Sequence, residues 1–295
     1  MFRHAIHILA AVFVAATCSP LFAEIRIGVQ APSGPEKARQ DWKDLAVYLS
    51  ERMGDEVVFV PVHPSEFREF CDAHPQGFLF HNPWVYIRAQ VLKGARALVT
   101  VKYEGTGSTL GGVVFARRDS GINYLPDVRD KVLLCFQFGS LGGWLMQKNE
   151  LVKNGITPEK DCRQLLEAPD QTEVVYAVRD KRADVGTVRT GILERMHSVG
   201  KIDLRDFRVL NEIHHEGFPQ LCSTPLYPEA AVAALRETPP EVAAKMRDAL
   251  LSIPSGHPAL RAPQVGGFVP ALDYGPVEEM CKRLGVEPFG KKRSQ

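Results

Sequence analysis

The sequence predicts an α/β protein of two lobes that are joined by two extended crossing segments. Short apolar runs alternate with segments that carry apolar residues at helical spacing, and this alternation indicates parallel sheets. The alternation breaks twice, at a Gly-rich stretch over residues 105–122 and at residues 207–225. A chain of 295 residues suffices for one large or two modest domains. Two alternating series separated by two breaks therefore predict two lobes with a shared cleft.

The first alternating series occupies residues 25–103. A short apolar run opens it, and the following segment carries apolar residues at helical spacing from Ala38 to Met53. Ser33 and Glu36 have the spacing of a capping box, which marks the start of this helix. Further strands are expected at 56–62, 77–80 and 97–103, with helices at 65–74 and 83–93.

The second alternating series lies between the two breaks. Strands are predicted at 132–136, 162–166 and 184–188, and helices at 141–154, 171–181 and 190–199. The chain after the second break reads as mostly helical, with Gly- and Pro-rich connections. The predicted division is residues 24–112 together with 213–295 for lobe 1, and residues 113–212 for lobe 2.

The first 23 residues differ from the rest of the chain. Arg3 and His4 precede an apolar stretch that is too short to span a membrane, and the small residue Ala23 suits signal peptidase. Residues 1–23 therefore read as a signal peptide, with an uncleaved anchor as the alternative. No later segment reaches the length of a membrane helix. We expect an exported protein that does not insert into the membrane after the signal is removed.

Charge and cysteine content exclude several kinds of partner. Removal of the signal peptide leaves 35 basic residues against 35 acidic ones, so the chain offers no general field for nucleic acid. Five cysteines remain, so a disulfide is possible but one thiol must stay unpaired. Cys71 and His74 form a lone C-x-x-H without the further ligands that zinc needs, and His214-His215 is a bare pair. We expect no metal, no cofactor and no nucleic-acid partner.

The stretch CFQFGSLGGWLMQKNELVKNG, residues 135–155, joins a buried strand to a helix through a Gly-rich turn. The helix should direct its unpaired N–H groups back at the turn, where Ser140 and the amides around Gly142 and Gly143 would form an anion site. The alternative is an ordinary strand-to-helix turn, in which glycine only supplies the bend and Ser140 only caps the helix. The local residues leave both interpretations open.

Three enzyme motifs fail at the Gly-rich turns. A nucleophile elbow needs G-x-S-x-G, but Ser140 follows Gly139 directly. A P-loop needs a Gly-Lys-Ser/Thr triplet, which does not follow Gly139. The stretch GTGSTLGG has Leu110 where a dinucleotide-binding motif needs its last glycine, and a strand rather than a helix is predicted after it. Because no nucleophile, base and orienting group come together, we expect no catalytic activity.

Two strand ends carry polar side chains that are candidates for the cleft. Asn82 ends the strand GFLFH, where it either caps the following helix or directs its amide into the cleft. Tyr86, one turn later, would add a hydroxyl and an aromatic wall. Arg189 follows the strand DVGTV, where it either binds an oxyanion or pairs with a neighbouring acid such as Glu194. Both strand ends are positions where α/β proteins bind ligands.

Several of these motifs occur together in a known family. FGSLGGWLMQKNELVKNGITPEKD, AVRDKRADVGTVRTGILERM and FLFHNPWVYIRAQ resemble the phosphate/phosphite/phosphonate solute-binding proteins of ABC transporters. RIGVQAPSGPEKARQDWKDLAVYLS and FPQLCSTPLYPEAAVAAL are more similar to the periplasmic sensor domains of tetrathionate-sensor-type histidine kinases, which share that fold. The resemblance implies the type II periplasmic-binding-protein fold, with a ligand held between the lobes.

The chain departs from the family where phosphonate is bound. Leu141 and Gly142 stand where the family's Ser-Thr-Ser has two of its hydroxyls. The family's Ser-His-Asp element aligns near Gln171 and Thr172, without its histidine, and Arg189 replaces an acid that contacts an aminoalkyl tail. Arginine at this position disfavours a cationic tail and favours a second anionic group. A phosphonate ligand should therefore not be inherited from the resemblance.

A thiol-based alternative arises from one further departure. Cys222 stands where the sensor domains usually have histidine before Ser-Thr, which places a thiol either in the site or in the packed core. The alternative function is a thiol-dependent binder of a thiophilic species such as arsenite, through Cys222 or Cys135. An exported α/β hydrolase is a further alternative.

We therefore expect a monomeric periplasmic solute-binding protein that presents a small oxyanion or compact organic anion to an ABC permease or a sensor histidine kinase. Ser140 and nearby amides would bind one anionic group, Arg189 would supply the compensating charge, and Trp144 would line the wall. The predicted ligand-binding residues are Asn82, Tyr86, Ser140, Leu141, Gly142, Gly143, Trp144, Gln171, Thr172, Arg189 and Thr190.

Overall fold

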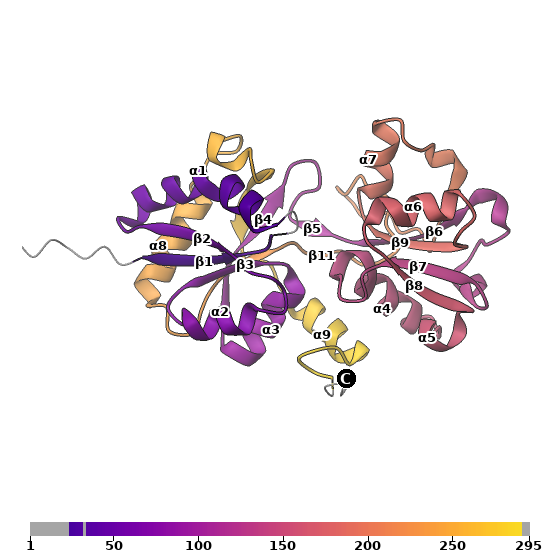
Figure 1. The fold of residues 1–295 in the computed structure, drawn as a ribbon, viewed down its shortest axis with the longest axis horizontal. Coiled ribbons are helices and arrows are strands. Elements are labelled where there is room, and N and C mark those ends of the chain that lie inside the picture. The colour runs from indigo at the N-terminus through magenta and orange to yellow at the C-terminus, as the bar shows by residue number, and fades with distance from the viewer. Residues whose placement is uncertain (1–23, 32–33, 291–295) are drawn as a thin grey trace, which may run out of the picture.

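The computed structural model describes residues 24–31 and 34–290, which form two lobes, each built around its own β-sheet (Figure 1). The predicted signal peptide and Ser33 lie outside the described residues. Among the described helices, none is long and apolar enough to cross a membrane. The predicted fold class is confirmed, because both sheets are flanked by helices and the chain crosses between the lobes in two extended segments.

The sheet of the first lobe has six strands in the order β13-β4-β12-β3-β1-β2. β1 pairs in parallel with β2 and β3, whereas β12 and β13 run antiparallel to their neighbours. Because parallel strands end at the same edge of a sheet, the residues that follow β1, β2 and β3 lie together. The strands are β1 (Ile25–Val29), β2 (Val57–Pro61), β3 (Phe78–His81), β4 (Arg96–Tyr103), β12 (Ala231–Ala234) and β13 (Val265–Pro270).

Helices cover both faces of this sheet. α1 and α8 pack on one face, where Trp42 stacks on Phe59 with ring centroids 5.1 Å apart; α2 and α3 cover the other face, and α9 packs against α3 toward the second lobe. Gly54 ends α1 with a φ of 72°, a left-handed conformation that glycine adopts without strain. The helices are α1 (Pro35–Met53), α2 (Phe67–Ala73), α3 (Pro83–Lys93), α8 (Pro240–Leu251), α9 (Gly275–Leu284) and the 3-10 turn η5 (Pro258–Leu260).

The sheet of the second lobe has five strands in the order β10-β6-β9-β7-β8. β7 pairs in parallel with β8 and β9, and β6 runs antiparallel between β9 and β10. α6 and α7 cover one face, and α4 and α5 lie on the other, with a π-helical turn η3 before α4. The strands are β6 (Gly112–Arg117), β7 (Val132–Phe136), β8 (Gln164–Ala168), β9 (Val185–Arg189) and β10 (Phe207–Leu210). The helical elements are η1 (Arg118–Ser120), η2 (Leu125–Val128), η3 (Leu141–Leu145), α4 (Met146–Lys153), α5 (Pro158–Asp161), α6 (Gln171–Arg179), α7 (Ile192–Ser198) and η4 (Leu204–Asp206).

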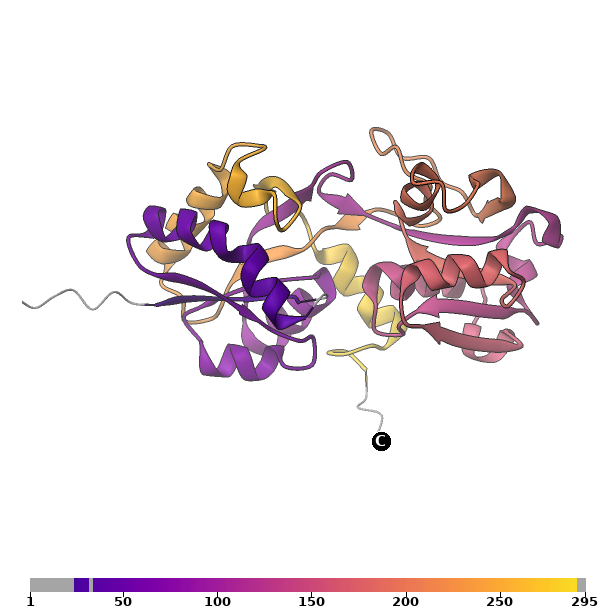
Figure 2. The same cartoon turned by 45° about the horizontal axis from the view of Figure 1, so that its top comes forward.

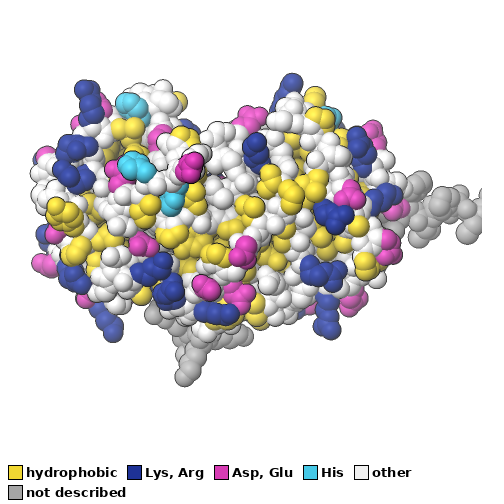
Figure 3. All heavy atoms as spheres, turned by 180° about the vertical axis from the view of Figure 1, so that it is seen from behind, with side chains coloured by type: hydrophobic (Ala, Val, Ile, Leu, Met, Phe, Trp, Pro, Cys, Tyr) yellow, Lys and Arg dark blue, Asp and Glu magenta, His cyan; other side chains and the backbone are white. Residues whose placement is uncertain are grey.

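Two extended segments join the lobes and pair with each other. One contains β5 (Thr109–Leu110) and the other β11 (Tyr227–Pro228), which run antiparallel and form a two-stranded hinge (Figure 2). Seen from behind, basic and acidic side chains are interspersed over both lobes (Figure 3). A charged ligand would therefore be selected by local geometry rather than by a field of one sign.

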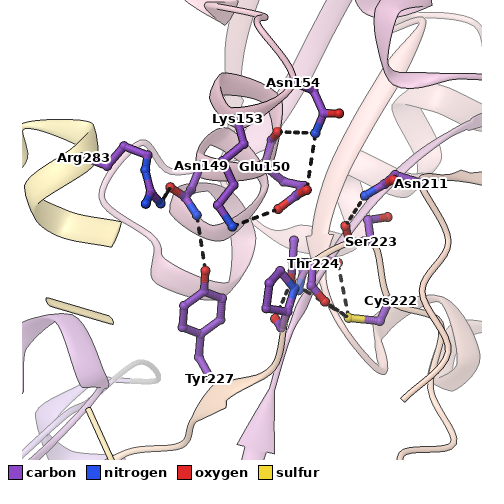
Figure 4. A network of polar contacts seen from close by, with 12 residues as sticks. Asn149, Glu150, Lys153, Asn154, Asn211, Cys222, Ser223, Thr224, Tyr227 and Arg283 are labelled. Atoms are coloured by element: carbon purple, nitrogen blue, oxygen red, sulfur yellow. Dashed lines mark hydrogen bonds and ion pairs between the residues drawn. The ribbon is translucent and has the colours of Figure 1, made fainter. Parts of the chain in front are cut away.

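A polar network also connects α9 to the second lobe (Figure 4). Nη1 of Arg283 in α9 donates to Oδ1 of Asn149 in α4 at 3.1 Å, and Nδ2 of Asn149 donates to the hydroxyl of Tyr227 in β11 at 3.3 Å. Asn149 is only 1% exposed, so its amide oxygen and nitrogen both depend on these partners. The relative position of the lobes therefore rests on specific contacts besides the two crossing segments.

Two details of the predicted secondary structure differ from the structure. The chain after the second break was expected to be mostly helical, but it supplies β12 and β13 to the first sheet. β12 reads AVAA, which favours a helix locally, yet it lies buried between β3 and β4, where strand pairing overrides that preference. The helix expected from residue 141 begins as a π-helical turn and becomes α-helical at Met146. The lobe boundaries at 112/113 and 212/213 stay a prediction.

Candidate functional site

A cleft of about 1150 Å³ lies between the two lobes. One wall contains the residues that directly follow β1, β2 and β3, and the other contains the residues that follow β7 and β8, together with the end of β9. Both sheets therefore direct the carboxyl ends of parallel strands at the same space. This is the edge at which open α/β sheets bind their ligands.

Buried side chains hold the loop that follows β7 in place through hydrogen bonds to its carbonyls. Nε2 of Gln147 donates to the carbonyls of Gly142 and Val188, each at 2.7 Å, and Oγ1 of Thr187 donates to the carbonyl of Gly143 at 2.8 Å. Gln147 and Thr187 are both fully buried. These bonds attach the loop to α4 and β9, so its shape is set by the protein core.

The same loop presents free backbone N–H groups to the cleft. Ser140 caps the turn, because its Oγ accepts from the N–H of Gly143 at 3.1 Å. Within the described part of the chain, the N–H groups of Leu141 and Gly142 have no acceptor, and residues 140–143 all line the cleft. Unpaired N–H groups at a helix start carry the positive end of the helix dipole and favour an anion. Ser140 thus fills the capping role, and the amides beside it provide the features of an anion site.

The start of α6, on the same wall, already holds an internal anion. The carboxylate of Asp170 accepts from the hydroxyl of Thr172 and from the N–H of Glu173, the latter at 2.8 Å. These bonds lower the pKa of Asp170. Oε1 of Gln171 accepts from the N–H of Arg189 at 2.7 Å, which ties α6 to the end of β9. An anionic ligand would be repelled here and favoured at the loop after β7.

Polar side chains contribute to the wall of the first lobe. Asn82 caps α3, with Oδ1 accepting from the N–H of Val85 at 3.1 Å, and its Nδ2 donates to Oε1 of Gln30 at 3.4 Å. His63 and Glu66 line the same wall, and the Glu66 carboxylate accepts from the N–H of His63 at 3.2 Å. Asn82 therefore caps its helix and also lines the cleft.

A buried histidine supports this wall. His81, at the end of β3, is only 1% exposed, and its Nδ1 accepts from the N–H of Asn82 at 2.9 Å. Burial lowers the pKa of His81 to about 3, so the imidazole stays neutral near pH 7. The position of Asn82 therefore depends on an imidazole that is neutral in the folded protein near pH 7.

Arg189 lines the cleft but does not carry an uncompensated charge. Its Nη2 donates to the carboxylate of Glu229, and its guanidinium carbon lies 5.8 Å from the ring centroid of Tyr103. The Glu229 side chain is 3% exposed and that of Arg189 is 30% exposed. The neighbouring acid expected from the sequence, Glu194, instead accepts from the N–H of Leu221 at 2.6 Å. The predicted compensating charge is therefore already used by a buried acid from the crossing segment.

A second arginine on the same wall has no such partner. Arg195 of α7 lines the cleft, is exposed, and makes no ion pair within the described residues. Three carboxylates also line the cleft, those of Glu66, Asp170 and Glu229. The lining as a whole is therefore not a positive basin, and an anion would have to be held by the loop amides and by Arg195 locally.

Three of the predicted ligand-binding residues lie away from the cleft lining. The hydroxyl of Tyr86 accepts from a backbone N–H of β4 at 3.2 Å, and its ring packs edge-to-face on Tyr274 at 4.7 Å. Trp144 is fully buried in the core beneath the loop, and Oγ1 of the buried Thr190 accepts from the N–H of Gly111 at 3.2 Å. Helical and strand periodicity turn these side chains inward, so Trp144 forms core rather than wall.

The two thiols of the alternative function are also buried. Cys135 and Cys222 are inaccessible to solvent and do not line the cleft. Burial raises the pKa of Cys135 to about 12 and also raises the pKa of Cys222. Sγ of Cys222 donates to the carbonyl of Thr224 at 3.1 Å (Figure 4), and all five cysteines of the described residues are free. Protonated thiols in the core do not favour a thiol-dependent binding site.

Sequence reasoning missed Glu229 and Arg195. Glu229 lies 40 residues after Arg189 on a different segment, and no local pattern relates the two. Arg195 had a weak signal, because it lies three residues after Ile192 and so shares a helix face with a residue that follows a strand end. Ile192 and Arg195 both line the cleft.

The fold and the cleft together define a two-lobed solute-binding protein, whose cleft lies at the carboxyl ends of strands from both lobes. Residues 27–274 match the family model described as ABC transporter, phosphonate, periplasmic substrate-binding protein. The chain belongs to this family, as its motifs predicted.

Named relatives agree with this assignment. The chain is 28% identical over 236 residues to the tetrathionate sensor histidine kinase TtrS of Salmonella typhimurium, and the match covers 78% of this chain but only 39% of TtrS. XAC2383 from Xanthomonas citri, bound to chloride ion, has a TM-score of 0.71 at 20% identity, with 88% of this chain and 98% of that chain covered. PhnD1 from Prochlorococcus marinus, in complex with methylphosphonate, has a TM-score of 0.65 at 12% identity, with the same coverage of 88% and 98%. At these identities the two structures establish the fold.

Proposed function

We propose that this protein captures a small oxyanion or compact organic anion between its lobes in the periplasm and presents it to a membrane partner. The observation that carries the proposal is the loop after β7. Its carbonyls are held by Gln147 and Thr187, while the N–H groups of Leu141 and Gly142 lack an acceptor within the described chain, and both residues line the cleft. Such a cradle needs no hydroxyl-rich side chains to attract an anion.

Charge on the same wall would come from Arg195 rather than from Arg189. Arg195 is exposed and has no ion-pair partner within residues 24–31 and 34–290, whereas Arg189 is held by Glu229. An unpaired guanidinium gains a charged hydrogen bond on binding an anion without losing an existing ion pair. Asn82 would approach the ligand from the other wall. Because a ligand stabilises the conformation in which it makes more contacts, contact with both walls favours closure of the lobes.

Two partners suit such a protein. The family model describes binding proteins of ABC transporters, and TtrS is a sensor histidine kinase, so the output is either delivery to an ABC permease or presentation to a kinase. The test is reconstitution of the ligand-loaded protein with each membrane protein. Stimulated ATP hydrolysis by a permease complex supports transport, and stimulated kinase autophosphorylation supports sensing. We propose no catalytic step.

The ligand class is tested by thermal shift of the mature protein against tetrathionate, sulfate, methylphosphonate and small carboxylates, because a ligand specific to the native state raises the melting temperature. Calorimetry on the best anion then compares Arg195→Gln with Arg205→Gln. Arg205 is an exposed arginine outside the cleft, so both variants lose the same net charge. We expect about tenfold weaker binding for Arg195→Gln, or about 1.4 kcal/mol, and little change for Arg205→Gln.

Two outcomes would contradict this proposal. A panel in which no anion raises the melting temperature removes the anion-binding function. Equal affinities for the two arginine variants would remove Arg195 from the site and leave the loop amides as the sole support.

A further inference from the structure

The ion pair between Arg189 and Glu229 lies where the lobes meet. Arg189 ends β9 of the second lobe, and Glu229 lies between β11 and β12, where the chain returns to the first lobe. The backbone of Glu229 is fixed on both sides. Its N–H donates to the carbonyl of Ser108 at 2.9 Å, and its carbonyl accepts from the hydroxyl of Tyr274 at 2.8 Å. These two bonds hold the backbone of Glu229 in place beside the hinge.

Arg189 is the cation that balances this carboxylate. The other titratable groups that face Glu229 are Tyr103 of β4 and Tyr274 at the start of α9. Burial raises the pKa of Tyr103 to about 12 and raises the pKa of Tyr274 as well, so both tyrosines are neutral near pH 7. Burial also raises the pKa of the Glu229 carboxyl, and the charge of Arg189 opposes that rise. The ionised state of Glu229 thus depends on its arginine.

Glu229 also lines the cleft, as Arg189 does. The guanidinium carries five N–H donors, and the structure assigns one of its nitrogens, Nη2, to Glu229. A ligand anion that reaches the remaining donors would place a second negative charge beside a carboxylate that is almost inaccessible to water. Keeping two anions beside one cation in a site that is almost inaccessible to water has a high free-energy cost. A buried carboxylate in this position lowers that cost by taking up a proton.

On the basis of the proposed function, we propose that Glu229 is a built-in competitor of the ligand for Arg189, and that an anion bound at Arg189 is accompanied by proton uptake at Glu229. Glu229 then determines specificity. It weakens binding of anions that reach the base of the cleft at high pH, and it leaves anions held only by the loop amides unaffected.

The direction of the pH effect follows from linkage. Without ligand, Arg189 restrains the pKa of Glu229; with a ligand anion on the guanidinium that restraint is lost and the pKa rises further. Between these two pKa values the complex holds one proton more than the free protein, so affinity rises as pH falls. The increase approaches tenfold per pH unit within that window and stops below the free-protein pKa.

Isothermal titration calorimetry with tetrathionate and with sulfate tests the proposal. Both anions keep a constant charge between about pH 5 and pH 8, so any proton uptake belongs to the protein. Each titration is run in two cationic buffers of different ionisation enthalpy, because an anionic buffer would compete for the cleft. The variants are Glu229→Gln, which keeps the shape without the charge, and Glu66→Gln, which removes another carboxylate of the cleft lining. Arg189→Ala is unsuitable, because it leaves Glu229 buried without a cation.

We expect wild-type protein to take up a fraction of a proton, at most one, and to bind more tightly as pH falls. Glu66→Gln should retain the uptake. Glu229→Gln should bind without uptake and with an affinity that is independent of pH and higher than wild type near neutral pH. Binding with identical enthalpy in both buffers and constant affinity would overturn the inference while leaving the proposed function intact. That negative result needs no variant, so it can overturn the inference even where Glu229→Gln does not fold. If neither tetrathionate nor sulfate binds, the inference is overturned for these two anions. If no anion of the whole panel binds, the proposed function is overturned too.

Discussion

The two walls of the cleft are lined by different kinds of chemical group. The wall of the second lobe presents backbone N–H groups, held from behind by Gln147 and Thr187, and the loop that carries them contains no titratable side chain between residues 137 and 143. The wall of the first lobe presents side chains around Asn82, which itself rests on the buried imidazole of His81. The first arrangement is set by packing of the chain, whereas the second depends on individual side chains and on their ionisation. Substitutions and pH should therefore affect the two walls differently.

The largest effect is expected from a single methyl group in the loop of the second lobe. A β-carbon on Gly143 would lie 2.9 Å from a ring carbon of Phe136, 3.0 Å from the β-carbon of Phe136 and 3.0 Å from Oγ of Ser140. The β-carbon of Phe136 is attached to β7 and cannot swing away, so Gly143→Ala must move the loop. We expect a loss of about 1–3 kcal/mol in the free energy of unfolding, measured by urea denaturation, and loss of anion binding.

The neighbouring glycine is the matched control for this variant. A β-carbon on Gly142 would meet the end of the Leu110 side chain at 3.2 Å, a contact that side-chain movement can relieve, and the β- and γ-carbons of Arg189 at 3.4 Å, the edge of ordinary van der Waals contact. Gly142→Ala should therefore cost less stability than Gly143→Ala. Equal costs for the two variants would contradict the view that the backbone of this wall is fixed by close packing against β7.

The wall of the first lobe should respond to acid. In the folded protein the pKa of His81 lies near 3, against an ordinary value of 6.5. Between these two pKa values, His81 is protonated in the unfolded chain and neutral in the folded protein. The contribution of this pKa difference to the free energy of unfolding is fully present above about pH 6.5 and is lost as pH falls toward 3. Between pH 7 and pH 5 this single group should remove about 2 kcal/mol from the free energy of unfolding.

His81→Asn separates this effect from other titrating groups. Asparagine retains an acceptor for the N–H of Asn82 but cannot titrate, so the variant should lose less stability between pH 7 and pH 5 than wild type does. His257→Asn is the control, because Nδ1 of this half-buried histidine makes the same type of bond, to the N–H of Ala259 at 3.2 Å. If His81→Asn and wild type show the same pH dependence, the buried imidazole is not the acid-sensitive group.

Most of the fold could be predicted, because local patterns specify it. Helical spacing marked α1, the Gly-rich stretch marked the first crossing segment, and the residues at the two predicted strand ends, Asn82 and Arg189, line the cleft. β12 was missed because its alanines favour a helix locally and its strand partners are more than a hundred residues away in the chain. Pairings over such separations leave no local trace in composition or periodicity.

The site could be predicted only where backbone geometry defines it. Ser140, Gly142 and Gly143 line the cleft because a Gly-rich turn between a strand and a helix must lie there. The charges could not be assigned, because the state of Arg189 depends on Glu229, which approaches it only through the return of the chain across the hinge. Tyr86 was misplaced for a simpler reason. A step of four residues from Asn82 returns nearly to the same helix face, but that face of α3 packs on Tyr274 instead of opening to the cleft.

The smallest predicted effect distinguishes the two roles of Asn82. Asn82→Ala removes the acceptor for the N–H of Val85 and should cost about 1 kcal/mol in the free energy of unfolding. Asn82→Asp keeps an acceptor at the helix start, so its stability should approach that of wild type, but it adds a negative charge to the cleft wall. Calorimetry should therefore show weaker anion binding for the aspartate variant than for the alanine variant, the reverse of their order in stability. If both variants bind as wild type does, Asn82 only caps α3, and the wall of the first lobe must contribute to binding through other residues.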